Sequence, residues 1–220
     1  MPPAILPALS YPVAGTRRER PLVGLWILLG VAFVVPLLPV VPAVGYLIRV
    51  LVASDRGESA PALLADVRTL LEQGIVGAVL VATFLAGPIA VLAITFYGAL
   101  FGGGGLDPGG LSTPAFYAAS TAMVISALLG AYLLPIALFR YGRAGAPGAA
   151  FEFRWLRGAG THGAYFAGWT LGATIGTLGI GLARVLADAT RIGPVLAALV
   201  IAYAAVVTCH VWGRTLARVH

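Results

Sequence analysis

Long apolar runs, separated by short polar turns, make up most of this chain. A membrane-crossing helix needs about 20 mostly apolar residues to match a hydrocarbon core about 30 Å thick. Thr113 followed by Pro114 is a typical helix start, because threonine caps free backbone N–H groups and proline fits the first turn. We therefore predict an all-α, polytopic transmembrane helix bundle with apolar segments at 21–54, 74–101, 113–140, 163–187 and 193–212.

The first apolar run, residues 21–54, poses a question of topology. As a single helix it would be about 50 Å long at 1.5 Å per residue, well beyond the hydrocarbon core. Pro36, Pro39 and Pro42 each remove a backbone donor and disfavour a straight helix. A hairpin that turns between these prolines, with short or re-entrant arms, gives about six membrane segments in all. A single kinked span with a projecting end is the alternative.

An internal repeat connects two distant stretches at an offset of 86 positions (147 minus 61). PALLADVRTLLEQGIVG at 61–77 aligns without gaps with PGAAFEFRWLRGAGTHG at 147–163, so that proline, acidic residue, arginine and two glycines coincide. Each copy, about 45–101 and 131–187, contains an apolar segment, a polar turn, an amphipathic helix and a second apolar segment. A chance match is the alternative.

The two copies predict amphipathic helices that lie in the membrane interface. In each copy apolar residues recur on one helical face while arginines occupy the other, which is typical of such helices. A helix that merely covers the end of the bundle is the alternative. The predicted interfacial residues are Leu63, Leu64, Val67, Leu70 and Leu71 in the first copy and Phe151, Phe153, Trp155 and Leu156 in the second.

Charged and small residues suggest how the helices pack. Asp66 with Arg68, and Glu152 with Arg154, lie two positions apart and cannot pair within one helix. If the copies pack about a pseudo-twofold axis, we expect the crosswise pairs Asp66–Arg154 and Glu152–Arg68. Small residues recurring every four positions let membrane helices approach closely, within a bundle or between two copies of the chain. The clearest such row is Gly168, Gly172 and Gly176.

Composition supports a membrane protein. Only 10% of the 220 residues are charged and 60% are hydrophobic, whereas soluble domains carry about 25% charged residues. The net charge of +6 would suggest nucleic acid in a soluble protein. Here the basic residues lie between apolar runs, so an anionic lipid surface is the expected partner. Nucleic acid is not an expected partner, and a homodimer or another membrane protein is an open alternative.

The arginine distribution predicts the orientation. Basic residues favour the cytoplasmic side, and the hairpin topology places 12 of the 14 on one side, against a 9 to 5 division for a single first span. We therefore predict a multi-pass protein of the cell membrane with both termini in the cytoplasm. Residues 1–20, rich in proline, are expected to be a disordered cytoplasmic tail before a single transmembrane domain at 21–218; a signal peptide is the alternative. The 12 are Arg17, Arg18, Arg20, Arg49, Arg56, Arg68, Arg140, Arg143, Arg154, Arg157, Arg214 and Arg218.

Candidate chemistry is sparse. Ionisable groups at mid-membrane mark ion and substrate paths. In this chain the ionisable residues of the apolar segments lie near the segment ends. The single Cys209 excludes an internal disulfide, His162 and His210 lack ligands at metal spacing, and no nucleophile–base pair is recognisable. We expect no catalytic residue, metal or cofactor.

The favoured function is a non-enzymatic component that organises lipids or protein partners at the cytoplasmic face. The alternative is a small pseudo-symmetric transporter or channel with a polar cavity lined by Ser and Thr.

Three stretches resemble the archaeal domain-of-unknown-function 4013 family of membrane proteins. GYLIRVLVASDRGESAPALLADVRTLLEQGIVGAVL (45–80) is similar to the start of that family, and PIALFRYGRAGAPGAAFEF (135–153) and HVWGR (210–214) are similar to its later segments. The acidic and aromatic character usual in the first amphipathic helix is reduced here to Asp66. The resemblance covers about 21–218 and implies an integral membrane protein with no established activity or catalytic residues.

Overall fold

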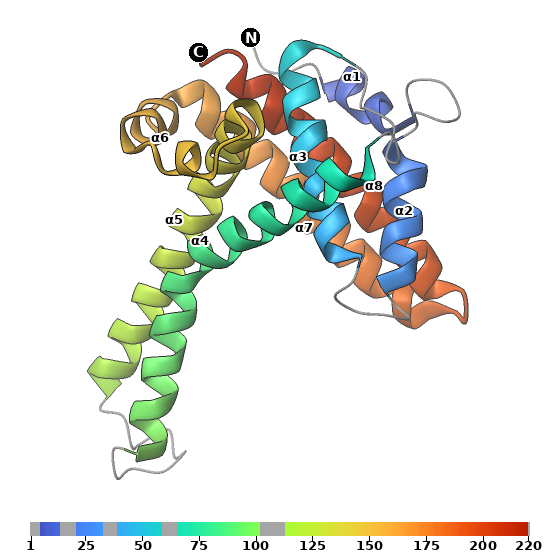
Figure 1. Ribbon diagram of the computed structural model, residues 1–220. Coiled ribbons are helices and arrows are strands. Elements are labelled where there is room, and N and C mark those ends of the chain that lie inside the picture. Colours follow the sequence, from blue (N-terminus) through green and yellow to red (C-terminus); the bar gives the residue numbers. More distant parts are fainter. Residues whose placement is uncertain (1–4, 14–20, 33–38, 59–65, 102–112, 220) are drawn as a thin grey trace. The chain divides into compact units, whose positions relative to one another are not determined.

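The computed structural model describes residues 5–13, 21–32, 39–58, 66–101 and 113–219. All regular elements in these ranges are helices (Figure 1), which confirms the predicted all-α class. The helices form two compact units: unit 1 comprises 1–78 with 135–220, and unit 2 comprises 79–134. The long helices α4 (Val67–Phe101) and α5 (Thr113–Ala144) each contribute one part to each unit.

Four helices of the described residues are long and apolar enough to cross a membrane, which is compatible with a multi-pass membrane protein. Helices α5, α7 (Gly163–Ala189) and α8 (Gly193–Leu216) begin at the predicted residues and extend two to four residues beyond their predicted ends. The candidate spans are Val67–Val91, Tyr117–Ala144, Gly163–Ala189 and Gly193–Leu216.

The first apolar run contains two helices, α2 (Pro21–Ala32) and α3 (Val40–Arg56). At 1.5 Å per residue they are about 18 and 26 Å long, short of a 30 Å hydrocarbon core. Pro39 directly precedes α3 and Pro42 lies in its first turn, where a missing N–H breaks no helical hydrogen bond. The structure therefore supports four of the roughly six predicted spans, and the membrane hairpin of α2 and α3 stays a prediction.

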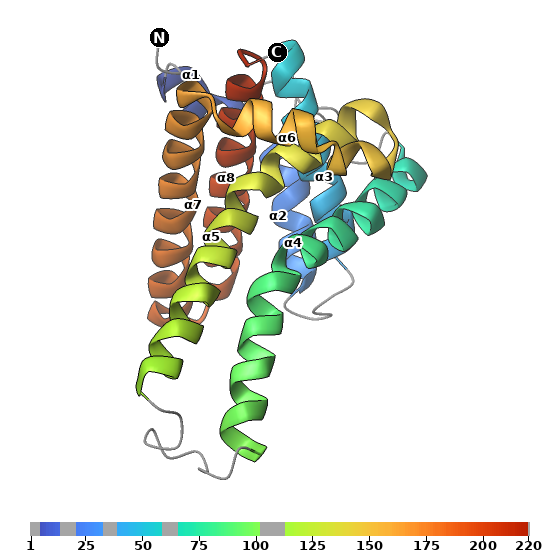
Figure 2. The ribbon, with the colours of Figure 1, turned by 90° about the vertical axis from the view of Figure 1, so that its left-hand side faces the viewer.

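Helix α8 is the centre of unit 1. It lies side by side with the antiparallel α7 and also contacts α2 and α3 (Figures 1 and 2). Ala202 and Val206 of α8 form an apolar cluster with Leu25 of α2 and with Tyr46 and Val50 of α3. Each of these five side chains is at most 1% exposed. Because lipid tails are as apolar as these side chains, close van der Waals packing is what holds such helices together in a membrane.

The N-terminal segment differs from the predicted disordered tail. Helix α1 (Ile5–Ser10) is followed by the 3₁₀ turn η1 (Tyr11–Val13). Ala8 is buried and packs with Val207 and Val211 of α8. In this segment apolar residues between the prolines meet a complementary surface on α8. The arginine cluster that follows η1 in the sequence lies outside the described residues.

Glycines end α3 and α5 in the same way. Gly57 and Gly145 both adopt the left-handed conformation, with φ of 72° and 69°. The Gly145 N–H donates to the Tyr141 carbonyl at 2.8 Å, which satisfies a carbonyl at the helix end. A side chain with a Cβ atom is disfavoured at such a position. After Gly145 the chain forms the 3₁₀ turn η2 (Pro147–Phe151) and the short helix α6 (Phe153–Gly160).

Unit 2 contains the C-terminal part of α4 and the N-terminal part of α5. Gly130 of α5 is buried, and a Cβ atom at this position would collide with the backbone of Phe84 in α4. Of the other small residues on this part of α5, Ala118 and Ala122 are exposed. Gly87 of α4 also faces Ser126 of α5, where an added Cβ atom would lie 3.6 Å from the serine Cβ, so small residues on both helices allow their close approach.

Candidate functional site

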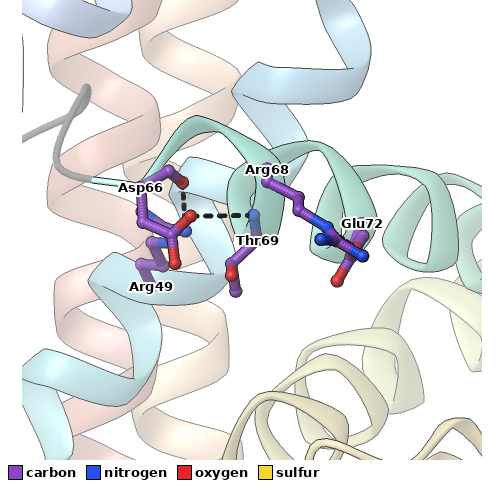
Figure 3. Close-up of polar contacts among 5 residues, drawn as sticks. All are labelled: Arg49, Asp66, Arg68, Thr69 and Glu72. Atoms are coloured by element: carbon purple, nitrogen blue, oxygen red, sulfur yellow. Dashed lines mark hydrogen bonds and ion pairs between the residues drawn. The ribbon is translucent and has the colours of Figure 1, made fainter.

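The start of α4 carries the charged residues of the first repeat copy (Figure 3). Asp66 Oδ1 accepts a hydrogen bond from the Thr69 N–H at 3.1 Å, as a helix cap does. Hydrogen bonding to Thr69 holds the pKa of the Asp66 carboxyl below its ordinary value of 3.8. Arg49 of α3 donates to the Asp66 carbonyl at 2.9 Å and to Gln73 Oε1 at 3.0 Å. Arg49 therefore ties the C-terminal half of α3 to the first turns of α4.

The predicted interfacial face of the first copy is only partly described, because Leu63 and Leu64 lie outside the described residues. Leu70 is 2% exposed, whereas Val67 and Leu71 are 48% and 41% exposed. These three residues therefore do not form one buried face.

The first copy has no separate amphipathic helix in the described residues, since α4 continues without a break through Gly74. The predicted span began at Gly74, after the predicted amphipathic helix. Instead a Cβ atom on Gly74 would collide with the Val41 backbone of α3, and one on Gly45 would collide with the Leu70 carbonyl. Gly74 is therefore needed where the backbones of α3 and α4 cross, and α4 continues through this glycine without ending.

In the second copy a separate helix is present. Helix α6 runs across the end of the bundle, at a steep angle to α7 and α8 (Figure 2). Leu156 and Ala159 of α6 are buried, whereas Phe151 of η2 and Phe153 of α6 are 51% and 75% exposed. Trp155 stacks on Phe139 of α5 with ring centroids 6.0 Å apart. The four predicted interfacial residues therefore differ in exposure: Leu156 and Trp155 pack on the protein, and the two phenylalanines are largely exposed.

The crosswise ion pairs predicted between the copies are not present among the described side chains. Arg68 pairs with Glu72 at 2.9 Å, one turn further along α4. Glu152 Oε2 accepts hydrogen bonds from Arg140 Nη2 at 2.7 Å and Nε at 3.0 Å. Both arginines find a carboxylate within their own copy. Arg140 and Glu152 are 12 positions apart, and the turn between them returns the chain to the same end of unit 1, which the sequence pattern did not reveal.

A pocket of about 450 Å³ opens beside α6. We call it the α6 pocket. Arg154, the predicted partner of Asp66, lines this pocket instead, together with Arg140 and Glu152. Trp155 also lines it, and the Arg140 guanidinium lies 5.5 Å from the centroid of that ring. The pocket therefore combines two cationic groups, one carboxylate and aromatic walls.

A second pocket, of about 290 Å³, lies between α3 and the start of α4. Arg49, Arg56, Glu58 and Gln73 line it. Arg49 already donates to Gln73 and to the Asp66 carbonyl, and no aromatic side chain lines this pocket.

Contrary to the sequence-based expectation, one hydroxyl–imidazole pair is present. Ser54 Oγ lies 2.8 Å from His210 Nδ1, and Tyr11 of η1 stacks on His210 with ring centroids 3.9 Å apart. The Ser54 side chain is fully buried and Tyr11 is 8% exposed. Burial raises the pKa of the Tyr11 phenol above its ordinary 10.0, although a hydrogen bond with Ser54 opposes this. A nucleophile must be reached by its substrate, so this geometry favours a buried contact that joins η1, α3 and α8.

The three predicted packing glycines face α8. A Cβ atom on Gly168 would collide with Thr215, and one on Gly172 would collide with the Trp212 indole. One on Gly176 would lie 3.5 Å from Thr208 Oγ1, an ordinary contact. The carbonyl of Gly172 also accepts a hydrogen bond from the Thr208 hydroxyl at 3.1 Å. This row therefore serves packing within one chain.

The hydroxyl groups of the candidate spans mostly bond their own helices. Thr83, Thr170 and Thr174 each donate to the carbonyl four residues earlier, at 2.8, 2.9 and 2.8 Å. In the part of the chain that the structure describes, no group of three or more His, Cys, Asp or Glu side chains could hold a metal ion.

Comparison with known proteins gives one match. A family model described as "Protein of unknown function (DUF4013)" matches residues 28–188. No curated protein and no solved structure matches the chain. The matched range contains both copies of the repeat and the whole of α6.

Proposed function

This chain belongs to the DUF4013 family of proteins of unknown function, and from that premise we propose that it is a non-enzymatic component of the cell membrane. It organises lipids, or a protein partner, at the cytoplasmic face. In this proposal the arginine-rich end of unit 1, which carries α6 and the C-terminal ends of α3 and α8, faces the cytoplasm together with both chain termini. The protein acts without a cofactor and without nucleic acid.

The observation that carries the proposal is the outward face of α6. Phe153 and Arg157 lie one turn apart on it, Phe153 is 75% exposed, and Arg154 and Arg157 are exposed beside it. Exposed aromatic rings next to arginines are the composition of helices that rest in the lipid headgroup region. The opposite end of unit 1 carries only Arg184 and Arg191 among the described arginines.

Membrane attraction at this end has an electrostatic and an apolar part. Each arginine near an anionic leaflet contributes about 1 kcal/mol, and this decays within a Debye length of about 8 Å. The apolar part comes from Phe151 and Phe153, whose exposed rings would be removed from water on contact with the membrane. A protein partner could use the same surface, but the mixture of rings and cations on a helix that lies across the bundle end favours lipid.

Transport is the alternative function. It needs a polar cavity at mid-depth, lined by side chains that are free to bind a substrate. Thr83, Thr170 and Thr174 bond within their own helices, so the described hydroxyls favour the organising role.

The orientation is tested with single cysteines in a Cys209→Ser background. Ala146 lies in the exposed turn between α5 and η2, and Thr190 lies in the exposed turn between α7 and α8. We expect a membrane-impermeant maleimide to label position 190 in intact cells and position 146 only in inverted vesicles. Labelling of 146 in intact cells, or of both positions from one side, would overturn the proposed orientation.

The contact of α6 with the membrane is tested by a nitroxide at position 153 in reconstituted vesicles. We expect collisions with oxygen to exceed those with a water-soluble nickel complex, since the side chain points into the headgroup region. A nitroxide at Thr161, which is exposed beyond the last residue of α6, is the control and should favour the nickel complex. Equal, water-like values at 153 and 161 would contradict the proposal.

A further inference from the structure

We propose that the α6 pocket binds the phosphodiester of a phospholipid whose headgroup carries a hydrogen-bond donor, such as the hydroxyls of phosphatidylglycerol. This inference rests on the proposed function, because it names the lipid class that the arginine-rich end would hold. It goes further by assigning a built site to one headgroup, in place of a diffuse charged surface.

The cations of the pocket come from two different elements. Arg140 projects from the end of α5 and Arg154 from α6, and both line the pocket. Arg140 is held in place on two sides, by the Glu152 carboxylate and by the face of Trp155 5.5 Å away. A guanidinium fixed in this way loses less side-chain freedom when it binds an anion. Arginine also matches the geometry of phosphate oxygens with parallel N–H groups.

Glu152 leaves Arg140 with capacity for a further ligand. It accepts from Nε and Nη2, two of the five N–H groups of that guanidinium. No ion pair to Arg154 is present in the described parts of the chain. With two arginines and one glutamate, the three side chains carry a net charge of +1, which matches the single negative charge of a phosphodiester.

The same carboxylate gives a reason for a donor on the headgroup. Glu152 is half exposed at the pocket, with 47% of its side chain accessible. An ionised carboxylate only accepts hydrogen bonds, so it favours a glycerol hydroxyl beside the phosphate. A trimethylated choline headgroup offers no N–H or O–H donor. A phosphomonoester would bring a second negative charge close to the carboxylate, which is unfavourable.

The apolar walls favour a lipid over a soluble phosphate. Phe153 and Trp155 line the pocket together with Val219 of the C-terminal segment. Phe153 is largely exposed, so the apolar wall continues onto the outward face of α6. Acyl chains can follow this surface while the phosphate meets the arginines. The pocket volume of about 450 Å³ lies within the usual range for small-molecule sites.

The test uses the full-length protein in a non-ionic detergent and measures lipid binding by native mass spectrometry. The probes are phosphatidylglycerol and phosphatidylcholine with the same acyl chains, glycerophosphoglycerol as the chain-free headgroup, and inorganic phosphate. Arg154→Gln is compared with Arg157→Gln. Both variants remove one positive charge from an exposed position of α6, but only Arg154 lines the pocket. Far-UV circular dichroism verifies that both variants keep the helical fold.

We expect one phosphatidylglycerol molecule to bind at least tenfold more tightly than phosphatidylcholine. Arg154→Gln should weaken this binding about tenfold, as expected for a lost charged hydrogen bond, while Arg157→Gln changes it less than twofold. Equal weakening by both variants would overturn the pocket but leave the charged surface of the proposed function intact. Glycerophosphoglycerol or phosphate binding as tightly as the lipid would show a soluble ligand and overturn the lipid assignment. No preference for phosphatidylglycerol over phosphatidylcholine would overturn both proposals.

Discussion

The contact between α7 and α8 allows a sharp prediction at Gly172. A Cβ atom there would collide with Trp212 Nε1 and would lie 2.8 Å from Cδ1 of the same indole. The indole is held by a hydrogen bond from its Nε1 to the Trp169 carbonyl at 3.3 Å. The Gly172 carbonyl accepts from Thr208 at 3.1 Å. The change Gly172→Ala therefore requires α8 to move away or the indole to rotate, and either shift disturbs these hydrogen bonds.

The size of the effect follows from opposing terms. Overpacking of a close contact costs about 1–3 kcal/mol, and two weakened interhelical hydrogen bonds add about 1 kcal/mol, at roughly 0.6 kcal/mol each in membrane proteins. The better helix propensity of alanine returns up to about 1 kcal/mol. We therefore expect Gly172→Ala to lower the free energy of unfolding by about 1–3 kcal/mol, from the balance of these terms.

The matched control lies on the same helix. Gly181 is exposed, and a Cβ atom there would meet no atom within 4 Å. Gly181→Ala should therefore show only the propensity gain, a stabilisation of up to about 1 kcal/mol. Reversible SDS titration in dodecylmaltoside micelles, followed by far-UV circular dichroism, measures both. If the two substitutions change stability in the same direction and by the same amount, the close approach of α7 and α8 at Gly172 is refuted.

Two further predictions concern polar contacts. Asp66→Ala should speed amide hydrogen exchange at Thr69, while Asp66→Asn, which keeps an accepting side-chain oxygen, should not. Because the folded pKa of Asp66 is depressed, its stabilising contribution is present above 3.8 and is lost as pH falls through the folded value, so the first turn of α4 should fray in acid. His210→Phe removes the imidazole partner of the Ser54 hydroxyl, which keeps its hydrogen bond with Tyr11, and should lower stability by about 0.5–1.5 kcal/mol in the same SDS titration. Ser54→Ala should cost less in the His210→Phe background than in the unchanged protein; equal costs would contradict the proposed pairing.

The pattern of apolar residues predicted the long helices that are continuous in sequence, such as α7 and α8. The starts of α7 and α8, and the turn between them, follow from Gly163, Gly193 and the charged residues at 188–192. The hairpin also brings the predicted glycine row onto α8. These features are local in sequence, so periodicity and turn residues contain the information that determines them.

Contacts across long stretches of chain could not be predicted in this way. Ser54 and His210 are 156 positions apart, and neither residue has a neighbour in sequence that signals the pairing. The N-terminal segment is similar: its prolines suggested disorder, yet η1 is placed by the stacking of Tyr11 on His210. Likewise, the α6 pocket depends on the ion pair between Arg140 and Glu152. This contact follows from the path of the chain through η2 towards α6, which the sequence pattern does not give.

The two aligned stretches, 61–77 and 147–163, use the same residue types differently. In each copy an arginine of the preceding helix engages the acidic residue: Arg49 reaches the Asp66 carbonyl, whereas Arg140 reaches the Glu152 carboxylate. In the first arrangement the Asp66 carboxylate caps α4, and α4 continues without a break to Phe101. In the second, Glu152 Oε2 accepts from Arg140, the Glu152 side chain makes no cap hydrogen bond, and α6 ends at Gly160 as a separate short helix. The arginine-lined pocket of the first copy has no aromatic wall, whereas Phe153 and Trp155 line the α6 pocket, which is why we place the lipid site in the second copy alone.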